Sequence, residues 1–396
     1  MATAATLRPV PAQLRRRPRR AEKSTLALFP SANRLSNALS SSGASSPPAP
    51  EPDRSSKPSA ELVGIARLAA SSPRADARRG TEYFLLPVRS ILNRCDSERV
   101  PFRWTVNPYR GCEFGCRYCY ARYTHEYMEL DGGEFERKIY AKQDAGALVE
   151  RDLDTEKIWG EHIAIGTATD PYQPAEREFA ATRAILEKMA VREGLSLSIT
   201  TKSNQVVRDL DILQRIAARS SLTINITVTT LRARLARLLE PRAPRPDLRL
   251  EAVRRLREAG LAAGVFASPI LPGLTDREED LDALACAARD AGAQWFVANV
   301  LFLMPSSQKQ FLPFLEARFP KLARRYRQWY AQSGYAPEPY RREIAARVNA
   351  LRKKYGLGGR PDANANLAWH SPQLVLSLEK EVEPAGIADA RLGARA

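Results

Sequence analysis

A regular alternation of strand-like and helix-like segments is the feature that most restricts how this 396-residue chain can fold. Runs that mix β-branched and small polar residues recur between residues 162 and 301 and are separated by helix-like periodicity. Repeated strand–helix units predict an α/β fold with a parallel sheet and right-handed crossovers. The carboxyl ends of such strands carry the chemistry in barrels of this kind. The expected strands are Arg103–Asn107, His162–Thr167, Leu195–Thr201, Leu222–Val228, Ala262–Ser268 and Gln294–Leu301.

The segments between these strands have the spacing of amphipathic helices. Asp247–Ala259 and Asp276–Ala291 are two of the expected helices, and Thr275 with Glu278 three residues later predicts an N-cap for the second. Lys138–Lys142 is expected to add a short strand outside the repeat. Two apolar helix faces support the remaining expected helices: Phe179, Thr182, Ile185, Leu186 and Met189, and then Leu210, Leu213 and Ile216.

Residues 311–357 predict a helical extension rich in aromatic residues and arginine. Its apolar stripe favours packing against the α/β domain over a platform for stacking nucleic-acid bases. The polar residues 358–396 are expected to form a tail.

Residues 1–80 predict a disordered basic tail, because Ala, Ser, Pro and Arg cannot bury enough apolar surface to offset the entropy of ordering. This segment holds 14 Lys and Arg against 5 Asp and Glu, so it carries more than half of the net charge of +16. An Arg-rich, Ser-rich start also fits an organellar transit peptide, and a bacterial chain with an unstructured extension is an equal alternative. The basic composition permits contact with nucleic acid through phosphates without demonstrating it.

Three of the five cysteines fall within eight residues, as Cys112, Cys116 and Cys119 in a C-x3-C-x2-C array. A [4Fe–4S] cluster takes four thiolates, so three would leave one iron open to another ligand. Tyr118 places an aromatic ring immediately before the last cysteine. A zinc site that recruits His125 and a set of inert thiols are the alternatives, although zinc usually takes four ligands from paired motifs.

The array resembles the C-x3-C-x-aromatic-C motif of the radical S-adenosylmethionine (radical SAM) enzymes, and further blocks resemble the branch related to spore photoproduct lyase. The resemblance covers about residues 82 to 345. It implies a partial (β/α)6 TIM-like barrel over residues 81–310, with the cluster and S-adenosylmethionine (SAM) at its mouth. The residues that carry it are Asn107–Arg122, Thr167–Glu176, Thr200–Ser203, Arg208-Asp209 and Leu239–Pro244 with Arg249.

The resemblance also implies roles for individual residues. Cys112, Cys116 and Cys119 would ligate the cluster, and Tyr118 would lie against the adenine of SAM. Thr169 and Asp170 stand where this branch contacts the polar groups of SAM, although Asp170 before Pro171 also reads as a helix N-cap.

Three later positions complete the expected SAM site. Lys202, at the end of the third expected strand, would pair with the SAM carboxylate. Thr227 would lie near the ribose, with Asn225 as its competitor for that role. Glu240 and Arg242 lie in one of the blocks that resemble the family. For these two residues, an internal ion pair that fixes their loop is an equal alternative to a role in the site.

One departure from the family pattern concerns the hydrogen-donating cysteine of spore photoproduct lyase. Its place falls here at Thr167 or Ala168, and neither side chain can return a hydrogen atom as a thiol does. Cys286 is expected within an apolar helix face and Cys95 in a polar turn ahead of the sheet, so both are poor substitutes. The lyase's own repair reaction is therefore not predicted, and no catalytic residue is assigned.

The sequence as a whole predicts a cytoplasmic radical SAM enzyme that forms a 5′-deoxyadenosyl radical and takes hydrogen from its substrate. Its expected partners are SAM and a one-electron donor of the flavodoxin or ferredoxin type. A nucleic acid is the leading substrate class, ahead of a peptide or a metabolite. Few, clustered cysteines fit a reducing compartment, and no apolar run reaches the length of a membrane span. The alternative is a non-catalytic, metal-stabilised adaptor that binds nucleic acid.

Overall fold

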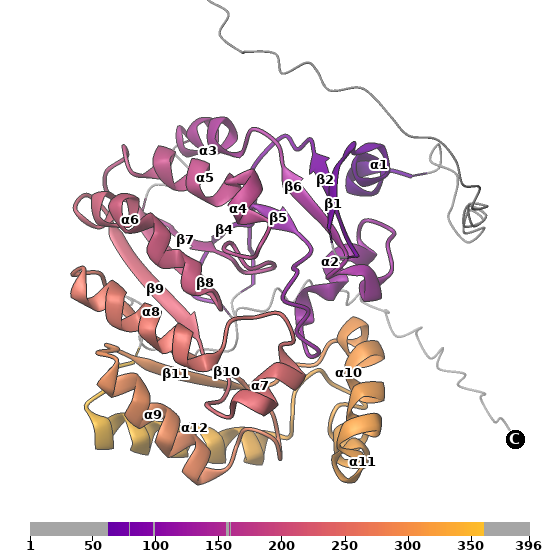
Figure 1. Cartoon of the computed structure of the whole chain (residues 1–396), viewed down its shortest axis with the longest axis vertical. Coiled ribbons are helices and arrows are strands. Elements are labelled where there is room, and N and C mark those ends of the chain that lie inside the picture. Colours follow the sequence, from indigo (N-terminus) through magenta and orange to yellow (C-terminus); the bar gives the residue numbers. More distant parts are fainter. Residues whose placement is uncertain (1–61, 79, 98–99, 156–157, 159, 360–396) are drawn as a thin grey trace, which may run out of the picture. The chain divides into compact units, whose positions relative to one another are not determined.

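The computed structural model describes residues 62–359 except 79, 98, 99, 156, 157 and 159 (Figure 1). Its larger sheet has seven strands in the order β11-β10-β9-β8-β7-β4-β3. Six of them are parallel and follow the chain order, as predicted, and only β3 (Leu92–Arg94) is antiparallel. The α/β class is confirmed, and the sheet is open between β3 and β11, so its closure into a partial barrel stays a prediction. The parallel strands are β4 (Trp104–Val106), β7 (His162–Ile165), β8 (Ser196–Thr201), β9 (Ser221–Thr227), β10 (Ala263–Ile270) and β11 (Phe296–Val300).

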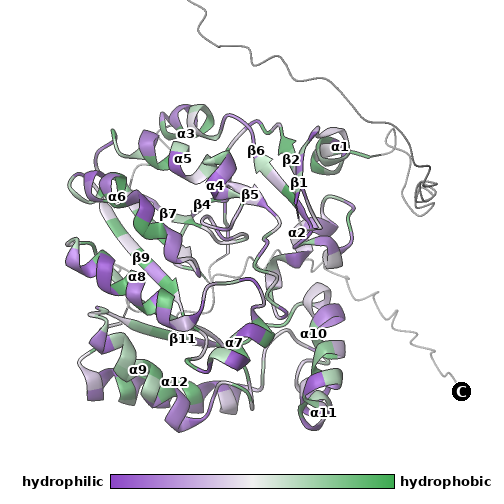
Figure 2. Ribbon diagram, in the orientation of Figure 1, coloured by the Kyte–Doolittle hydropathy of each residue, from purple (hydrophilic) through white to green (hydrophobic). Residues whose placement is uncertain are grey.

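Helices cover one face of this sheet and form the main hydrophobic core with it (Figure 1). Alternate strand residues such as Ile163, Ile199 and Val265 are buried against apolar helix residues. Figure 2 shows the matching pattern, with hydrophobic colour along the strands and mixed faces on the surrounding helices. The covering helices are α3 (Ala145–Leu153), α4 (Glu176–Phe179), α5 (Ala181–Met189), α6 (Leu210–Ala217), α8 (Pro246–Glu258) and α9 (Glu278–Asp290), with the 3-10 helix η5 (Asn204–Asp209) before α6.

The predicted start of α9 is wrong in one detail. The N-cap of α9 is Arg277, and Thr275 instead accepts a hydrogen bond at 2.9 Å from the backbone amide of Leu271 through its hydroxyl. Thr275 therefore closes the turn after β10 rather than capping the helix. Short-range spacing alone could not separate these two uses of a threonine hydroxyl.

A smaller, four-stranded sheet precedes and flanks the larger one, in the order β1-β2-β6-β5. The expected extra strand is confirmed as β6 (Lys138–Lys142). The prediction of a disordered tail is wrong for residues 64–78, which form α1 and β1, and residues 1–61 lie outside the described part. Ala69 on α1 packs in a small core with Leu86 and Tyr140, which supplies the apolar burial that composition did not suggest. The other elements here are α1 (Gly64–Ser71), β1 (Arg74–Arg78), β2 (Thr81–Leu86) and β5 (Tyr109–Arg110).

Three helices follow β11: α10 (Pro305–Arg318), α11 (Pro320–Trp329) and α12 (Glu338–Tyr355). The helical character of the predicted extension is confirmed, but its boundary at residue 311 cuts through α10. Ile344, Val348 and Leu351 of α12 join the main core, so this helix completes the covering of the sheet. No helix in the described part of the chain is both long and apolar enough to cross a membrane.

The face of the sheet away from these helices carries polar and aromatic side chains. Asn225 on β9 accepts a hydrogen bond at 3.1 Å from the indole nitrogen of Trp295, which lies just before β11 and is fully buried. Gly264 on β10 makes room for this indole, because a Cβ atom at position 264 would lie 2.4 Å from the ring. Trp295 and Gly264 therefore fit together only as a pair.

Replacing Gly264 with alanine is expected to destabilise the protein by about 1–3 kcal/mol, since the rigid, buried indole has no free space into which to move. A lower urea midpoint for unfolding would measure the loss. The matched control is Gly132→Ala, where the nearest atom to the added methyl group would lie at an ordinary 3.6 Å. Equal midpoints for the two variants would contradict the assigned packing of Gly264 against Trp295.

Candidate functional site

The three clustered cysteines lie in a loop between β5 and a short helical segment, η2 (Tyr120–Arg122) followed by α2 (Tyr123–Glu126). Gly111 starts the loop with φ +82°, and a Cβ atom there would lie 2.6 Å from the carbonyl oxygen of Lys138, so only glycine fits. The amide of Cys112 then donates a hydrogen bond at 3.0 Å to the carbonyl of Phe135, next to the 3-10 helix η3 (Gly132–Glu134). These contacts fix where the first cysteine leaves the small sheet.

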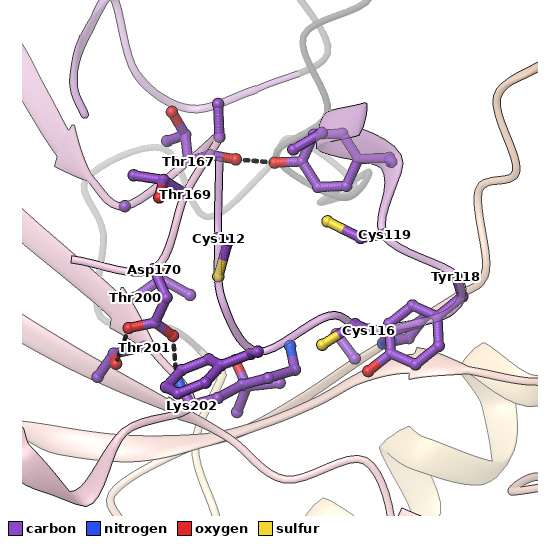
Figure 3. Close-up of a pocket in the computed structure, with 18 of the residues that line it drawn as sticks. Cys112, Cys116, Tyr118, Cys119, Thr167, Thr169, Asp170, Thr200, Thr201 and Lys202 are labelled. Atoms are coloured by element: carbon purple, nitrogen blue, oxygen red, sulfur yellow. Dashed lines mark hydrogen bonds between the residues drawn. The ribbon is translucent and has the colours of Figure 1, made fainter. Parts of the chain in front are cut away.

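All three cysteines line one cavity of about 150 Å³ (Figure 3). The opposite sides of this cavity come from the carboxyl ends of the parallel strands, as the sequence predicted. Figure 3 shows the three sulfur atoms facing the same space, with Thr169, Asp170 and Lys202 across from them. Tyr118, Thr169, Asp170, Lys202 and Thr227, the five residues predicted to bind SAM, all line this cavity.

The surroundings of the three thiols disfavour their ionised form when no metal is bound. Burial raises the pKa of each cysteine, that of Cys116 to about 12, so thiolates need a bound cation to form here. Among residues 62–359, gaps aside, no three His, Cys, Asp or Glu side chains come close enough to share one metal ion. A [4Fe–4S] cluster places each thiolate on a different iron, so three sulfurs spaced around a cavity suit it.

His125, the residue that the zinc alternative would use, is already engaged elsewhere. Its Nε2 lies 3.0 Å from the carbonyl oxygen of Lys138, and its ring packs edge-on against Phe135 and Tyr140. Burial lowers the pKa of His125 to about 4, so the ring is neutral at pH 7. The side chain acts as a core residue that supports the cysteine loop.

Asp170 connects the ends of β7 and β8 across the floor of the cavity. Its carboxylate accepts hydrogen bonds from the hydroxyl of Thr201 at 2.6 Å and the amide of Lys202 at 2.7 Å (Figure 3). It also accepts one from the amide of Tyr172 at 2.9 Å. Burial raises the pKa of Asp170, and these donors oppose that rise. The bond to Tyr172 is a local turn contact of the capping type, so the structural alternative for Asp170 holds beside its place in the cavity wall.

Thr169 joins the same cavity wall to the cysteine loop. Its hydroxyl donates at 2.6 Å to the carbonyl of Gly111 and accepts at 3.0 Å from the side-chain amide of Gln173. The amide of Glu113 in turn donates to the Gln173 side chain at 2.9 Å. Thr169 and Gln173 therefore hold the first turn of the loop against the end of β7.

Lys202 places an ammonium group next to the cysteine loop. Its Nζ lies 5.9 Å from the centre of the Tyr118 ring, and in the described part of the chain no carboxylate reaches it within ion-pair distance. Burial would lower the pKa of Lys202, but the charges of Cys116 and Glu240 outweigh burial and raise it. The side chain is thus a partly buried cation available to an anionic ligand.

Glu240 and Arg249 form a buried ion pair behind the loop, and each is 1% exposed. Arg249 Nη2 lies 2.5 Å from Glu240 Oε2, so the ion pair of Glu240 with Arg242, which the sequence allowed as an alternative, is wrong in its partner. The hydroxyls of Tyr118 and Thr229 both donate to the other carboxylate oxygen of Glu240. Burial opposes ionisation of Glu240, but Arg249 and Lys202 outweigh it and lower its pKa to about 2.

Arg242 serves the loop by another route. Its backbone amide donates at 3.2 Å to the carbonyl of Phe114, and its guanidinium donates at 3.1 Å to the carbonyl of Glu136. The amide of Arg117 also donates at 2.9 Å to the carbonyl of Leu239, at the end of α7 (Ala233–Leu239). The segment from Leu239 to Arg242 therefore clamps the cysteine loop from behind.

Thr227 and its competitor Asn225 are separated by the structure. Thr227 lines the cavity at the end of β9, and its carbonyl accepts a hydrogen bond from Arg249 at 3.1 Å. Asn225 lies two residues earlier on β9, and its side chain is hydrogen-bonded to Trp295 and Thr200 instead. Of the two, only Thr227 is placed to meet a ligand in the cavity.

The position expected to correspond to the hydrogen-donating cysteine of spore photoproduct lyase is also in the cavity wall. Thr167 and Ala168 both line it, and the Tyr120 hydroxyl donates to the carbonyl of Thr167. Cys95 was expected in a polar turn, but it is buried in a small apolar cluster with Phe102. Cys286 is partly exposed on α9, within 3.7 Å of Asp290, rather than buried in an apolar face.

Sequence reasoning missed several residues of the cavity. Tyr120 follows the last cysteine and had no assigned role. Phe266 within β10 and Leu301 and Phe302 just after β11 form an apolar wall of the cavity. Phe302 directly follows an expected strand and Leu301 is the last residue of that strand, which was the available signal, since parallel strands bring their carboxyl ends together.

A family model described as "Radical SAM superfamily" matches residues 106–285 of the chain. This range begins in β4 and ends in α9, so it contains the cysteine loop and four further parallel strands. The match covers the loop together with most of the strand ends that surround the cavity.

Among the most similar proteins, an uncharacterized protein of Mycobacterium tuberculosis (strain H37Rv) is 35% identical over 309 residues, which is 78% of this chain and 89% of the relative. An uncharacterized protein of Methanocaldococcus jannaschii is 31% identical over 176 residues, 44% of this chain and 63% of its own length. A spore photoproduct lyase structure with bound AdoMet and dinucleoside spore photoproduct has a TM-score of 0.52 at 15% identity, covering 75% of this chain and 86% of that one. The last likeness concerns the fold.

Proposed function

Because this chain belongs to the radical SAM superfamily and is an enzyme, we propose that Cys112, Cys116 and Cys119 hold a [4Fe–4S] cluster. SAM would bind beside the cluster in the same cavity. The bound cluster would supply one electron to SAM, which splits into methionine and a 5′-deoxyadenosyl radical that takes a hydrogen atom from the substrate. The observation that carries the proposal is that one cavity gathers three thiols on one side and five strand ends on the other.

The cavity residues would bind SAM through one charged group, through hydroxyl groups and through an aromatic ring. Lys202 offers its ammonium to the carboxylate of SAM, and Asp170 fixes the backbone of Lys202 so that its side chain leaves toward the cavity. Thr169 and Thr227 present hydroxyl-bearing strand ends to the polar groups of the ligand, and Tyr118 lies against its adenine.

The apolar wall of the cavity would exclude water from the bound SAM. Phe266, Leu301 and Phe302 remove water from the side of the cavity that faces the cysteines. A radical that meets no solvent and no stray hydrogen donor can react only with the substrate placed against it. Thr167 and Ala168 in this cavity offer no thiol, so we propose a reaction that differs from spore photoproduct lyase in how hydrogen is returned.

A nucleic acid is the substrate class that we propose first. The net charge of +16 favours a polyanion, and the lyase of similar fold has been captured with a dinucleoside photoproduct. A reducing cytoplasm, which would protect the cluster, is the compartment that we propose. A non-catalytic adaptor has no remaining support, because the family is one of enzymes.

Anaerobic reconstitution tests the proposed chemistry. The purified chain supplied with iron and sulfide is expected to hold about four irons, one for each corner of the cluster, and to show a broad visible absorption. Dithionite and SAM should then yield methionine and 5′-deoxyadenosine in equal amounts. Protein that retains zinc alone under these conditions, with no 5′-deoxyadenosine, would refute the proposal.

Deuterated oligonucleotides give the test of substrate class. Transfer of deuterium from a duplex or single strand into 5′-deoxyadenosine would support a nucleic-acid substrate. Transfer only from a labelled peptide or metabolite would reject it while leaving SAM cleavage intact.

A further inference from the structure

Helix α11 presents a purely basic face to solvent. Its sequence, from Pro320 to Trp329, contains no acidic residue, and Lys321, Arg324, Arg325 and Arg327 are all exposed. Arg327 pairs with Glu316 of α10, and Arg325 lies over the ring of Trp329. In the described part of the chain, Lys321 and Arg324 have no carboxylate within ion-pair distance, so their charges are open to a partner.

The other face of α11 packs toward the cysteine loop. Tyr326 is fully buried, and its ring centre lies 5.6 Å from that of Phe311 on α10. Phe311 in turn lies 6.4 Å from the ring of Tyr118 in the cysteine motif. A continuous aromatic contact therefore runs from the cysteine loop to the helix that carries the basic face.

Basic residues of α7 extend this face. Arg232, just before α7, donates to the carbonyl of Leu274 in the turn after β10 and pairs at 3.2 Å with Asp280 of α9, so its charge is already matched. Gly273 in the same turn lies close to Leu322 and Arg325 of α11. Arg234 and Arg237 of α7 are exposed as well. We call the surface formed by the exposed basic residues of α7 and α11 the basic surface: Arg234, Arg237, Lys321, Arg324 and Arg325.

The basic surface lies behind the cysteine loop, not around the cavity. No residue of α7, α10 or α11 lines the cavity that we assign to SAM and the substrate. The end of α7 nevertheless contacts the loop directly, through the bond from the Arg117 amide to the Leu239 carbonyl. This surface is thus close to the cysteines without blocking the way in for substrate.

We infer that the basic surface docks the acidic one-electron carrier protein, of the flavodoxin or ferredoxin type, that reduces the cluster. The inference rests on the proposed function. The reduced carrier loses one electron, the cluster gains it, and the same electron then enters the C–S bond of SAM. The carrier is a better occupant than a nucleic acid, because an electron must arrive at the cysteines whereas a polyanionic substrate must reach the cavity.

The physics of transient redox complexes fits such a surface. Electron-transfer partners meet through small, weak interfaces in which complementary charge sets the association rate. Steering of this kind raises association rates by one to three orders of magnitude and falls steeply with added salt. Lys321 and Arg324 are exposed and have no ion-pair partner among the described residues, so they should contribute most to the rate of association with the carrier.

Charge reversal at Lys321→Glu and Arg324→Glu together is the test, with Arg215→Glu and Arg255→Glu as the matched control. The control residues are exposed on α6 and α8 and change the net charge equally. With photoreduced flavodoxin at low salt, reduction of the cluster in the α11 variant is expected to slow about tenfold, and that of the control to stay near wild type. The wild-type rate should fall with salt toward that of the α11 variant.

Dithionite separates this inference from the proposed function. With dithionite, wild type and both variants should release 5′-deoxyadenosine equally, and failure of all three would refute the proposed function instead. An α11 variant that flavodoxin reduces as fast as wild type, or one that is slowed no more than the control variant, would overturn the docking site. Loss of oligonucleotide binding with an unchanged flavodoxin rate would assign the surface to nucleic acid.

Discussion

Replacing Cys116 with alanine is expected to abolish formation of 5′-deoxyadenosine, down to the level without enzyme. Cys116 is the middle member of the array, and its sulfur faces the cavity with those of Cys112 and Cys119 (Figure 3). Two remaining thiols leave two irons of a cubane cluster without a protein ligand, and such a cluster does not persist. Iron content, visible absorption and 5′-deoxyadenosine after anaerobic reconstitution measure the result.

Cys286→Ala is the control for this experiment, because Cys286 is partly exposed on α9 and far along the chain from the loop. It should keep full iron content and SAM cleavage. Substantial SAM cleavage by the Cys116 variant, or equal iron loss in both variants, would show that the array does not hold the cluster.

Replacing Arg249 with alanine is expected to lower the free energy of unfolding by about 3–5 kcal/mol, the range for breaking a buried ion pair from one side. Glu240 would keep its charge in a site where it is 1% exposed, with the hydroxyls of Tyr118 and Thr229 and the more distant charge of Lys202 left to stabilise it. Arg249 also donates at 2.8 Å to the carbonyl of Pro244 and at 3.1 Å to that of Thr227, so both carbonyls lose a donor. Urea unfolding of the cluster-free protein measures the change.

The nearby pair of Arg245 and Asp247 supplies the comparison. Both side chains are more than half exposed, and a surface pair of this kind contributes about 0–1 kcal/mol. Arg245→Ala should therefore leave the urea midpoint nearly unchanged. A similar small effect of Arg249→Ala would mean that water reaches Glu240 and that the pair is not the clamp we describe.

The strand order of the larger sheet was predictable because each strand is short, buried and followed by an amphipathic helix. Periodicity recovers such units one at a time, and chain order then sets their neighbours. Residues 64–78 were missed for the opposite reason: β1 has the sequence Arg-Ala-Asp-Ala-Arg, and it is a strand because β2 pairs with it. Pairing of this kind is a tertiary effect that composition does not record.

The positions of the site residues were more predictable than their partners. The resemblance to the radical SAM branch, together with the convergence of strand ends, predicted that Thr169, Asp170, Lys202 and Thr227 meet, and all four line the cavity. The partner of Glu240 was wrong, because Arg242 is its neighbour in sequence whereas Arg249 reaches it from the first turns of α8. Only the three-dimensional path of the intervening residues decides between two arginines.

The contact between Gly264 and Trp295 has a consequence for how related chains can vary. An indole 2.4 Å from the site of a missing Cβ atom makes the two positions one unit, although 30 residues of chain lie between them. A homologue with alanine or a larger residue at the position of Gly264 should carry a smaller side chain at that of Trp295. Substitutions at these two positions should therefore appear together across the family, and rarely one without the other.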